Sequence, residues 1–279
     1  MNKILLMKLI PIVLLICSLL LGCAKNQSMQ NNSSKSITVQ TIEDGFNSTM
    51  IDNKNFISYC AKEKSKENQI YFNYPLFNEI VNNADQLNAI IINFVDSTLQ
   101  DICNGGFVGN LKDFPENWDW SSEKYTVQAM YINYKIERSD SDYLSVIFEG
   151  LCNYKGTPHP LKYFNSLIID IENCELVTLV YFYNINEAFI ELIRKEFPRQ
   201  FISYWGVKEE EYIEEYLTRY TDDELIEKLK FSNLTPSSGI YSYLTFDQLG
   251  ISFNMPYAIG GHFEVLIDYE ELTEYLKLP

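Results

Sequence analysis

Only two histidines, His159 and His262, occur in the 279 residues, which limits the acid–base and metal chemistry open to this chain. A catalytic histidine needs a nucleophile or a carboxylate within hydrogen-bond reach. No Gly-x-Ser-x-Gly, P-loop, Rossmann or His-Glu-x-x-His pattern supplies such a setting. His159 lies between Pro158 and Pro160, and His262 follows Gly260-Gly261. We interpret both as residues that fix local backbone through a hydrogen bond, and we predict no catalytic, cofactor-binding or metal-ligating residue.

The 38 acidic residues could supply a carboxylate pair for glycoside hydrolysis, but that chemistry depends on separation in space. Among so many carboxylates some pair would always fit, so their number identifies no active site. Their more direct consequence is charge, formally −16. Such a surface repels nucleic acid and anionic lipid headgroups, and it attracts cationic partners or simply maintains solubility.

The six cysteines fall into two groups. Cys17 and Cys23 belong to the apolar N-terminal region, whereas Cys60, Cys103, Cys152 and Cys174 are spread through the body of the chain. Outside the membrane, four thiols permit two disulfides in three connectivities, and the sequence does not choose among them. Free buried thiols are the alternative. No Cys-x-x-Cys pair is present, so we predict no zinc site.

The first 22 residues have the pattern of an export signal. Lys3 and Lys8 precede an apolar run from Leu9 to Leu21, which is short for a membrane span of about 20 apolar residues. The run ends in Leu20-Leu21-Gly22-Cys23, which resembles the lipobox of bacterial lipoproteins. The resemblance implies cleavage before Cys23 and attachment of diacylglyceryl and palmitate chains to it. Two or more chains anchor a protein stably. We therefore expect a lipoprotein on the extracytoplasmic face of the cell membrane, with a mature charge of −18 because Lys3 and Lys8 are removed.

Residues 23–41 are polar and rich in Asn, Ser and Gln, which predicts a flexible tether. Beyond it, short strands are predicted at Phe56–Cys60 and Gln69–Asn73, with Tyr74-Pro75 ending the second. The apolar spacing from Ala84 to Ile102 predicts a helix that stops at Asn104-Gly105-Gly106.

The middle of the chain alternates as strands do. The phase shift between Ala129 and Ile132 predicts a β-bulge. Strands through 144–148 and 167–171, with turns at 139–142 and 172–175, predict an antiparallel meander.

Three helices are predicted next, of which Pro198 kinks or ends the first. The second is lined by Tyr212, Ile213, Tyr216 and Leu217 and carries a cluster of glutamates that we interpret as a solvated face. The third is lined by Leu225, Ile226 and Leu229. A hairpin over 241–255, a strand through Val265 and Ile267 and a short acidic helix over 269–276 complete the chain.

Strands, then helices, then strands, without βαβ alternation, predict an α+β fold of antiparallel sheets packed with helices. We predict a signal at 1–22, a tether at 23–41, a domain at 42–183 and a helical and C-terminal region at 184–279. We expect the last two to form one continuous globule.

Two stretches resemble known extracytoplasmic families. The first, from Tyr71 to Tyr183, includes Tyr74-Pro75, Gly156-Thr157-Pro158-His159-Pro160 and Leu167-Ile168-Ile169-Asp170, and it resembles the PdaC-type domain found beside peptidoglycan deacetylases. The second, from Leu249 to Leu272, resembles the C-terminal part of the extracytoplasmic domain of the lysozyme-sensing anti-sigma factor. The chain departs from the first family at Gly156-Thr157-Pro158, where Gly-Gly-Ala is usual, and at Cys174, where glycine is usual.

The resemblance implies a ligand-binding or accessory module on a lipid tether. No deacetylase catalytic domain and no cytoplasmic sigma-binding segment is expected. We therefore predict a cell-surface binding module for lysozyme, another basic protein or a cell-wall ligand, without cofactor. An envelope enzyme or accessory protein acting on peptidoglycan is the alternative, and a purely structural lipoprotein is a third.

Overall fold

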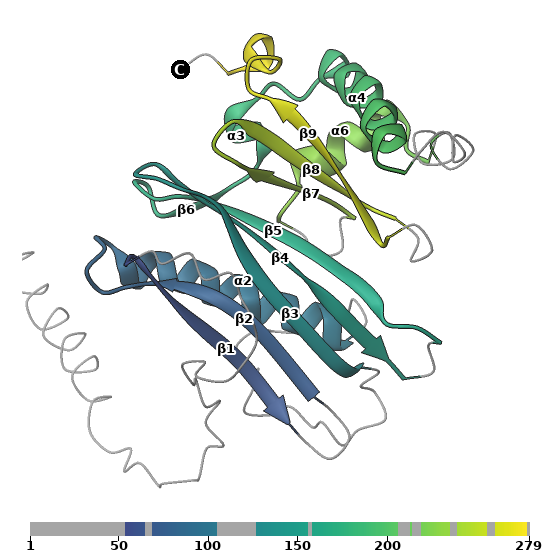
Figure 1. Ribbon diagram of the computed structural model, residues 1–279. Coiled ribbons are helices and arrows are strands. Elements are labelled where there is room, and N and C mark those ends of the chain that lie inside the picture. The colour runs from purple at the N-terminus through teal and green to yellow at the C-terminus, as the bar shows by residue number, and fades with distance from the viewer. Residues whose placement is uncertain are drawn as a thin grey trace, which may run out of the picture. The chain divides into compact units, whose positions relative to one another are not determined.

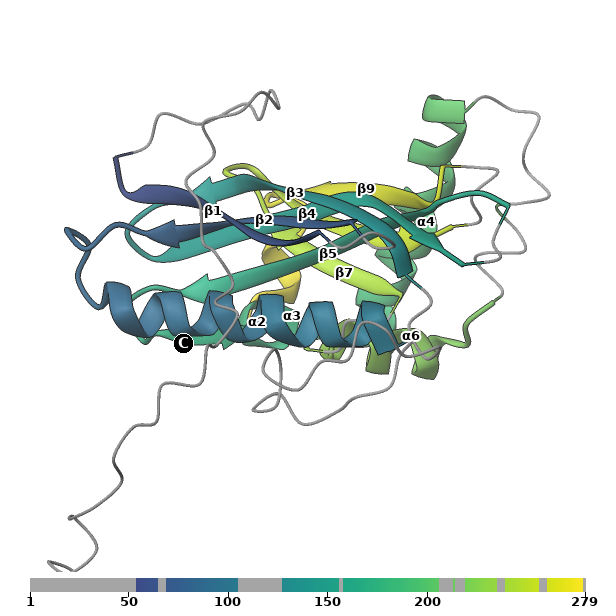
Figure 2. The ribbon, with the colours of Figure 1, turned by 90° about the horizontal axis from the view of Figure 1, so that it is seen from below.

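A six-stranded sheet with strand order β1-β2-β3-β4-β5-β6 forms the larger layer of the computed structural model, which describes residues 54–64, 69–104, 127–155, 158–205, 213, 219–234, 239–255 and 260–277. Its strands are β1 (Phe56–Lys64), β2 (Gln69–Phe77), β3 (Val127–Ser139), β4 (Tyr143–Tyr154), β5 (Leu161–Asp170) and β6 (Glu175–Val177). Helix α2 (Ala84–Asn104) lies along one face of this sheet (Figures 1 and 2). It buries Leu87, Ile91, Val95 and Leu99 in the sheet's apolar core, so the predicted stripe and helix are confirmed.

The connection from β2 through α2 to β3 corrects one prediction. β2 and β3 pair in parallel, with Gln69 opposite Ala129 and Phe72 opposite Ile132, whereas all other strand pairs of this sheet are antiparallel. The chain thus contains one β-α-β unit that the sequence pattern did not reveal. A parallel pair needs a long crossover connection, and the helix together with residues 105–126 supplies its length. The α+β class, with mainly antiparallel sheets, is as predicted.

Strand β2 continues through Tyr74-Pro75, where we predicted it to end. Pro75 pairs with Ser58 of β1, and the pairing of β2 with β3 stops at Phe72. A proline is tolerated in a strand where no second neighbour requires its missing N–H. Strand β1 also extends into the charged stretch, as far as Lys64.

Strand β3 is irregular at two places. Register shifts against β4 occur between Val127 and Ala129 and between Ile136 and Arg138. The first brings Val127, Met130 and Ile132 to the buried face, which confirms a bulge near the predicted change of phase. The second was not predicted.

A second layer is built on the three-stranded antiparallel sheet β7-β8-β9, comprising β7 (Ile240–Leu244), β8 (Gln248–Asn254) and β9 (His262–Asp268). Helix α4 (Glu187–Trp205) packs its aromatic residues on this sheet, with Phe197 5.1 Å from Phe253 and Phe201 5.0 Å from Phe263 between ring centroids. α4 runs through Pro198, so the alternative that this proline ends the helix is wrong. The short helix α3 (Leu179–Phe182), which the sequence pattern did not predict, precedes α4.

Helix α6 (Asp222–Lys230) also belongs to this layer and buries Leu225 and Leu229, as its spacing predicted. Its first turn is closed by a capping box. The Thr221 hydroxyl accepts from the N–H of Glu224, whose carboxylate accepts from the N–H of Thr221. The predicted helix around 212–217 lies outside the described residues except for Ile213, which is helical and buried. The predicted C-terminal helix is reduced to a 3-10 turn, Thr273–Tyr275, after a turn at 269–272.

The two sheets are joined by buried polar groups. Ser166 of β5 donates to the carbonyl of Ser242 in β7 at 2.8 Å, and the N–H of Leu244 donates to the hydroxyl of Ser145 in β4 at 2.8 Å. Asn233, which follows α6, accepts from the N–H of Ser242 at 2.9 Å and donates to its carbonyl at 2.7 Å. These contacts tie the C-terminal layer to the larger sheet, although the boundary at residue 183 remains a prediction. Within the described ranges, no helix is long and apolar enough to cross a membrane.

Candidate functional site

Residues 1–41, including the proposed attachment site Cys23, lie outside the described residues, and so does the side chain of Cys103. No disulfide joins any two of Cys60, Cys152 and Cys174. Cys152 is buried among apolar side chains, and this burial raises the pKa of its thiol to about 12. Cys152 is therefore a poor nucleophile, since reactivity requires the thiolate.

His159 is exposed at the end of the β4–β5 connection. The neighbouring Gly156-Thr157 lies outside the described residues. Substitutions at exposed positions usually change stability by less than about 0.5 kcal/mol. The local role of His159 stays a prediction, with an expected effect on stability of this small size.

His262 contacts other side chains rather than the local backbone that we predicted it to fix. It begins β9, packs against Phe164 in a tilted arrangement with ring centroids 4.8 Å apart, and places Nε2 3.5 Å from a carboxylate oxygen of Glu264. The hydroxyl of Tyr243 donates to the other oxygen of Glu264. Burial raises the pKa of Glu264, but the contacts with His262 and Tyr243 outweigh it and leave the pKa below its ordinary value. No hydroxyl or thiol nucleophile among the described residues hydrogen bonds to His262, so this group lacks the partner that covalent catalysis needs.

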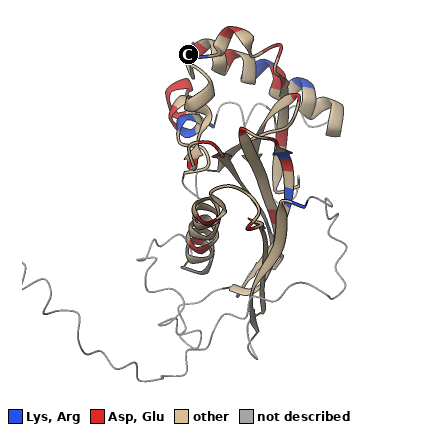
Figure 3. Ribbon diagram, turned by 90° about the vertical axis from the view of Figure 1, so that its left-hand side faces the viewer, with Lys and Arg blue, Asp and Glu red and all other residues tan. Residues whose placement is uncertain are grey.

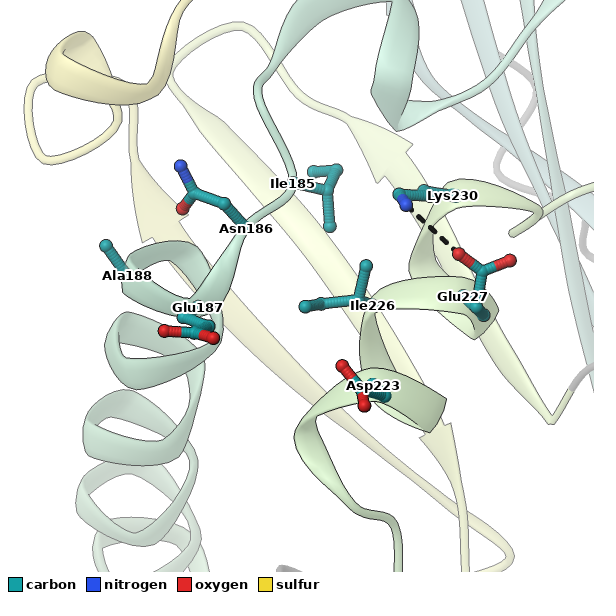
Figure 4. A pocket seen from close by; sticks show the side chains of 8 residues that line it. All are labelled: Ile185, Asn186, Glu187, Ala188, Asp223, Ile226, Glu227 and Lys230. Atoms are coloured by element: carbon teal, nitrogen blue, oxygen red, sulfur yellow. Dashed lines mark hydrogen bonds and ion pairs between the residues drawn. The ribbon is translucent and has the colours of Figure 1, made fainter.

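An open groove of about 710 Å³ lies between the start of α4 and the outer face of α6. Figure 4 shows the start of α4, with Glu187, on one side of the groove and Asp223 and Ile226 of α6 on the other. Asn186 is the N-cap of α4, because its side-chain oxygen accepts a hydrogen bond from the N–H of Phe189 at 3.1 Å.

Helix periodicity assigns one face of α6 to this groove. Asp223, Ile226, Glu227 and Lys230 follow the spacing i, i+3, i+4, i+7, while Leu225 and Leu229 face the core. Every polar lining residue comes from the first turn of α4, the residue before it, or this α6 face. The groove is therefore built on two helices that the packed core holds in place.

The groove, which we call the acidic groove, has apolar and acidic parts. Ile185, Ala188 and Ile226 provide apolar surface, and Glu187, Asp223 and Glu227 provide three carboxylates against the single ammonium group of Lys230. Lys230 forms an ion pair with Glu227 at 3.0 Å. Glu187 and Asp223 form no ion pair within the described part of the chain. Side chains with an apolar stem and a cationic end, such as Lys and Arg, match this combination.

The acidic groove was not predicted from the sequence. The denser cluster of glutamates within residues 209–215, which we interpreted as a solvated face, lies outside the described residues. The i, i+3, i+4, i+7 spacing of Asp223, Ile226, Glu227 and Lys230 could have predicted that these residues share one face of α6. The position of this face in the same groove as Glu187 depends on the packing of α6 against α4, which sequence spacing alone does not reveal.

In the described part of the chain, no group of three or more His, Cys, Asp or Glu side chains could hold a metal ion. Figure 3 shows acidic positions along the helices as well as at strand ends. The chemistry that the acidic groove offers is therefore electrostatic and apolar recognition by carboxylates and aliphatic side chains.

No protein-family model matches the chain, and no curated protein matches it. Two solved structures show a distant likeness. A DUF3298 family protein from Pseudomonas aeruginosa PAO1 has 12% sequence identity and a TM-score of 0.44, covering 80% of this chain and 92% of its own. A member of the DUF3298 family from Bacteroides fragilis NCTC 9343 has 17% identity and the same TM-score, covering 80% of this chain and 93% of its own. Neither likeness assigns a function to this chain.

Proposed function

We propose that this chain is a lipid-anchored, extracytoplasmic binding module that recognises a cationic protein, lysozyme being the leading candidate, through the acidic groove between α4 and α6. The observation that carries the proposal is the composition of the groove. Carboxylates from two helices, Glu187 of α4 and Asp223 and Glu227 of α6, line one groove together with the apolar side chain of Ile226. A lysine or arginine side chain would place its stem on Ile226 and its charge beside Glu187 or Asp223.

The charge of the whole chain supports the same class of partner. A formal charge of −16 creates a field that draws cationic proteins toward the surface and raises their association rate. The electric field of this charge gives no specificity by itself, since it attracts any basic protein. The groove supplies the shaped contact that distinguishes one basic protein from another.

Attachment at Cys23 is the second part of the proposal. It is supported by the Leu20-Leu21-Gly22-Cys23 sequence and by the polar stretch that follows. An anchored module of this kind would meet an attacking lysozyme at the cell surface. The resemblance of residues 249–272 to a lysozyme-sensing domain points in the same direction.

The test is a titration of the immobilised chain with lysozyme at low and physiological salt, with an equally basic small protein as control. Screening acts over about 8 Å at physiological ionic strength. The association rate should therefore fall by about tenfold or more between the two salts, while the dissociation rate changes less. Lysozyme should still bind more tightly than the control at physiological salt. Equal binding of the two proteins would reduce the charge to a solubility feature and end the lysozyme proposal.

A further inference from the structure

Strand β9 is an edge of the three-stranded sheet, since it pairs with β8 alone. Its hydrogen-bonding directions follow from two contacts. The N–H of Met255 donates to the carbonyl of Gly261, so residues 255 and 261 form a hydrogen-bonded pair. Antiparallel pairs alternate, so the N–H and C=O groups of His262, Glu264 and Leu266 point away from β8.

At Leu266 this edge is already occupied. The side-chain amide of Gln200 donates to the carbonyl of Leu266 at 2.7 Å and accepts from its N–H at 2.9 Å. A single side chain from α4 thus makes the two hydrogen bonds that a neighbouring strand would make. No described group forms the equivalent bonds at His262 or Glu264.

A groove of about 560 Å³, which we call the β9 groove, runs beside these two open positions. One wall is the C-terminal part of α4, with Arg199, Ser203 and the 75% exposed Tyr204, and the other includes Lys162 at the start of β5. Figure 1 shows α4 beside β9. The open backbone groups therefore lie beside a groove that side chains of α4 and β5 also line.

The charge of the β9 groove is opposite to that of the acidic groove. Its one carboxylate, Glu264, accepts from Tyr243 and contacts His262, so it is already engaged. Arg199 forms an ion pair with Glu196 of its own helix, whereas no described acid forms an ion pair with Lys162. Lys162 crosses Gly261 so closely that a Cβ added there would lie 2.5 Å from the Cβ of Lys162. This close approach places the lysine beside the open end of β9.

We propose that the β9 groove binds an extended polypeptide segment that adds a strand to β9 at His262 and Glu264 and presents a carboxylate side chain to Lys162. Strand addition supplies affinity through backbone hydrogen bonds, and side-chain contacts supply the selectivity. This site differs from the acidic groove in residues, charge and partner. The proposal of strand addition does not depend on whether lysozyme binds the acidic groove.

The probe is a fluorescein-labelled nine-residue peptide of alternating Thr and Val with a central Glu, whose binding to the full chain is followed by fluorescence anisotropy. Two N-methylated versions, blocked at odd or at even positions, test the backbone contacts without changing the protein. One should bind like the parent, and the other should lose affinity by about tenfold or more, because only one set of N–H groups faces β9. A peptide with Lys in place of Glu should also bind more weakly.

Protein variants test the two walls. Lys162→Glu should weaken peptide binding by about tenfold. Lys155→Glu is the matched control, because Lys155 is an exposed lysine just after β4 that does not line the groove. His262→Pro removes one outward N–H at the first residue of β9, where proline is tolerated. It should abolish binding, because one of the two open positions of β9 then lacks its donor.

Three outcomes would overturn the proposal. The first is equal binding of both methylated peptides, and the second is an equal effect of Lys162→Glu and Lys155→Glu. The third is a dimer, detected by light scattering, that the peptide dissociates, because this would assign the β9 edge to a second copy of the chain. If His262→Pro fails to fold, the methylated peptides still decide the question.

Discussion

Cys174 is a cysteine in a backbone conformation that suits glycine. Its φ of +52° lies in the left-handed region, in the turn between β5 and β6, and its thiol makes a weak 3.6 Å contact with the carbonyl of Ile171. The family that residues 71–183 resemble usually has glycine at this position. The observed φ gives the physical reason for that preference, because a Cβ in the left-handed region clashes with the neighbouring carbonyl.

We expect Cys174→Gly to raise the free energy of unfolding by about 1 kcal/mol, because the left-handed strain is removed. Cys174→Ala is the control, since alanine keeps the strain and loses only the sulfur contact. It should leave stability unchanged or slightly lower. Urea denaturation of the three proteins measures both effects, and an equal response to Gly and Ala would rule out backbone strain as the cause.

Asp170 precedes the same turn between β5 and β6 and accepts hydrogen bonds from within it. Burial raises the pKa of its carboxyl, but hydrogen bonds from the backbone and side chain of Asn173, at 2.8 and 3.0 Å, and from Tyr181, at 2.7 Å, outweigh it. The pKa therefore lies below its ordinary value. An acid with a lowered folded-state pKa stabilises the fold above its unfolded-state pKa. This contribution is lost as the pH falls through the folded-state pKa.

Asp170→Asn should therefore lower the free energy of unfolding by about 1–2 kcal/mol at pH 7, through weaker hydrogen bonds to an uncharged acceptor. The difference from the unchanged protein should shrink below about pH 4, where Asp170 itself becomes protonated. Urea midpoints measured from pH 7 to pH 3 test this. A difference that stays constant over that range would show that the carboxylate charge is not involved.

At the scale of elements, the end of α6 is joined to both sheets by Asn233. This residue is 3% exposed, has a φ of +73°, and hydrogen bonds to Ser166 of β5 and Ser242 of β7. A buried amide with several partners is costly to remove, because its partners remain buried and unpaired.

Asn233→Ala should lower the free energy of unfolding by about 2–4 kcal/mol, and Asn233→Gly by about 1 kcal/mol less than that, because glycine relieves the left-handed strain. Thermal unfolding followed by circular dichroism would measure both. A loss below about 0.5 kcal/mol for both variants, the range of ordinary surface changes, would show that the junction contributes nothing to stability.

Most individual elements could be predicted from the sequence because their signals are local. The apolar stripe of α2, the alternation of β4 and β5 and the hairpin β7–β8 each follow from periodicity over a few residues. The parallel pairing of β2 with β3 could not, since it depends on contacts between residues about 60 positions apart. The end of β2 was wrongly predicted at Tyr74-Pro75 for a similar reason. A proline is tolerated in β2 only beyond the last residue that pairs with β3, and the sequence does not show where that pairing stops.

The candidate site was less accessible than the fold. Asp223 and Glu227 share a helix face that spacing could have identified. Their relation to Glu187 depends on how α6 packs against α4, and the outward groups of β9 depend on the register with β8. Both relations are set by tertiary structure and have no local sequence signal.

At the scale of the whole molecule, the proposed anchor makes a direct prediction. Cys23→Ala should abolish labelling by a fatty-acid analogue, because the acceptor thiol is lost, and should release the protein from the membrane or leave it unprocessed. Metabolic labelling followed by membrane fractionation measures both. Label retained in the variant would place the acyl chains elsewhere.

The central claim is that the acidic groove, rather than total charge, recognises a cationic protein. It is tested by neutralising the groove with Glu187→Gln, Asp223→Asn and Glu227→Gln together. The matched control, Glu79→Gln with Glu172→Gln and Glu175→Gln, removes the same charge from exposed positions outside the groove.

The measurement is the Kd for lysozyme at physiological salt, made after circular dichroism has shown that both variants are folded. The groove variant should bind about tenfold or more weakly than the unchanged chain, a loss of about 1.4 kcal/mol, because groove contacts remain effective where long-range attraction is screened. The control should change by less than about threefold, since exposed charges distant from the contact contribute little. Equal losses in the two variants would contradict the account, because they would show that net charge alone attracts the protein.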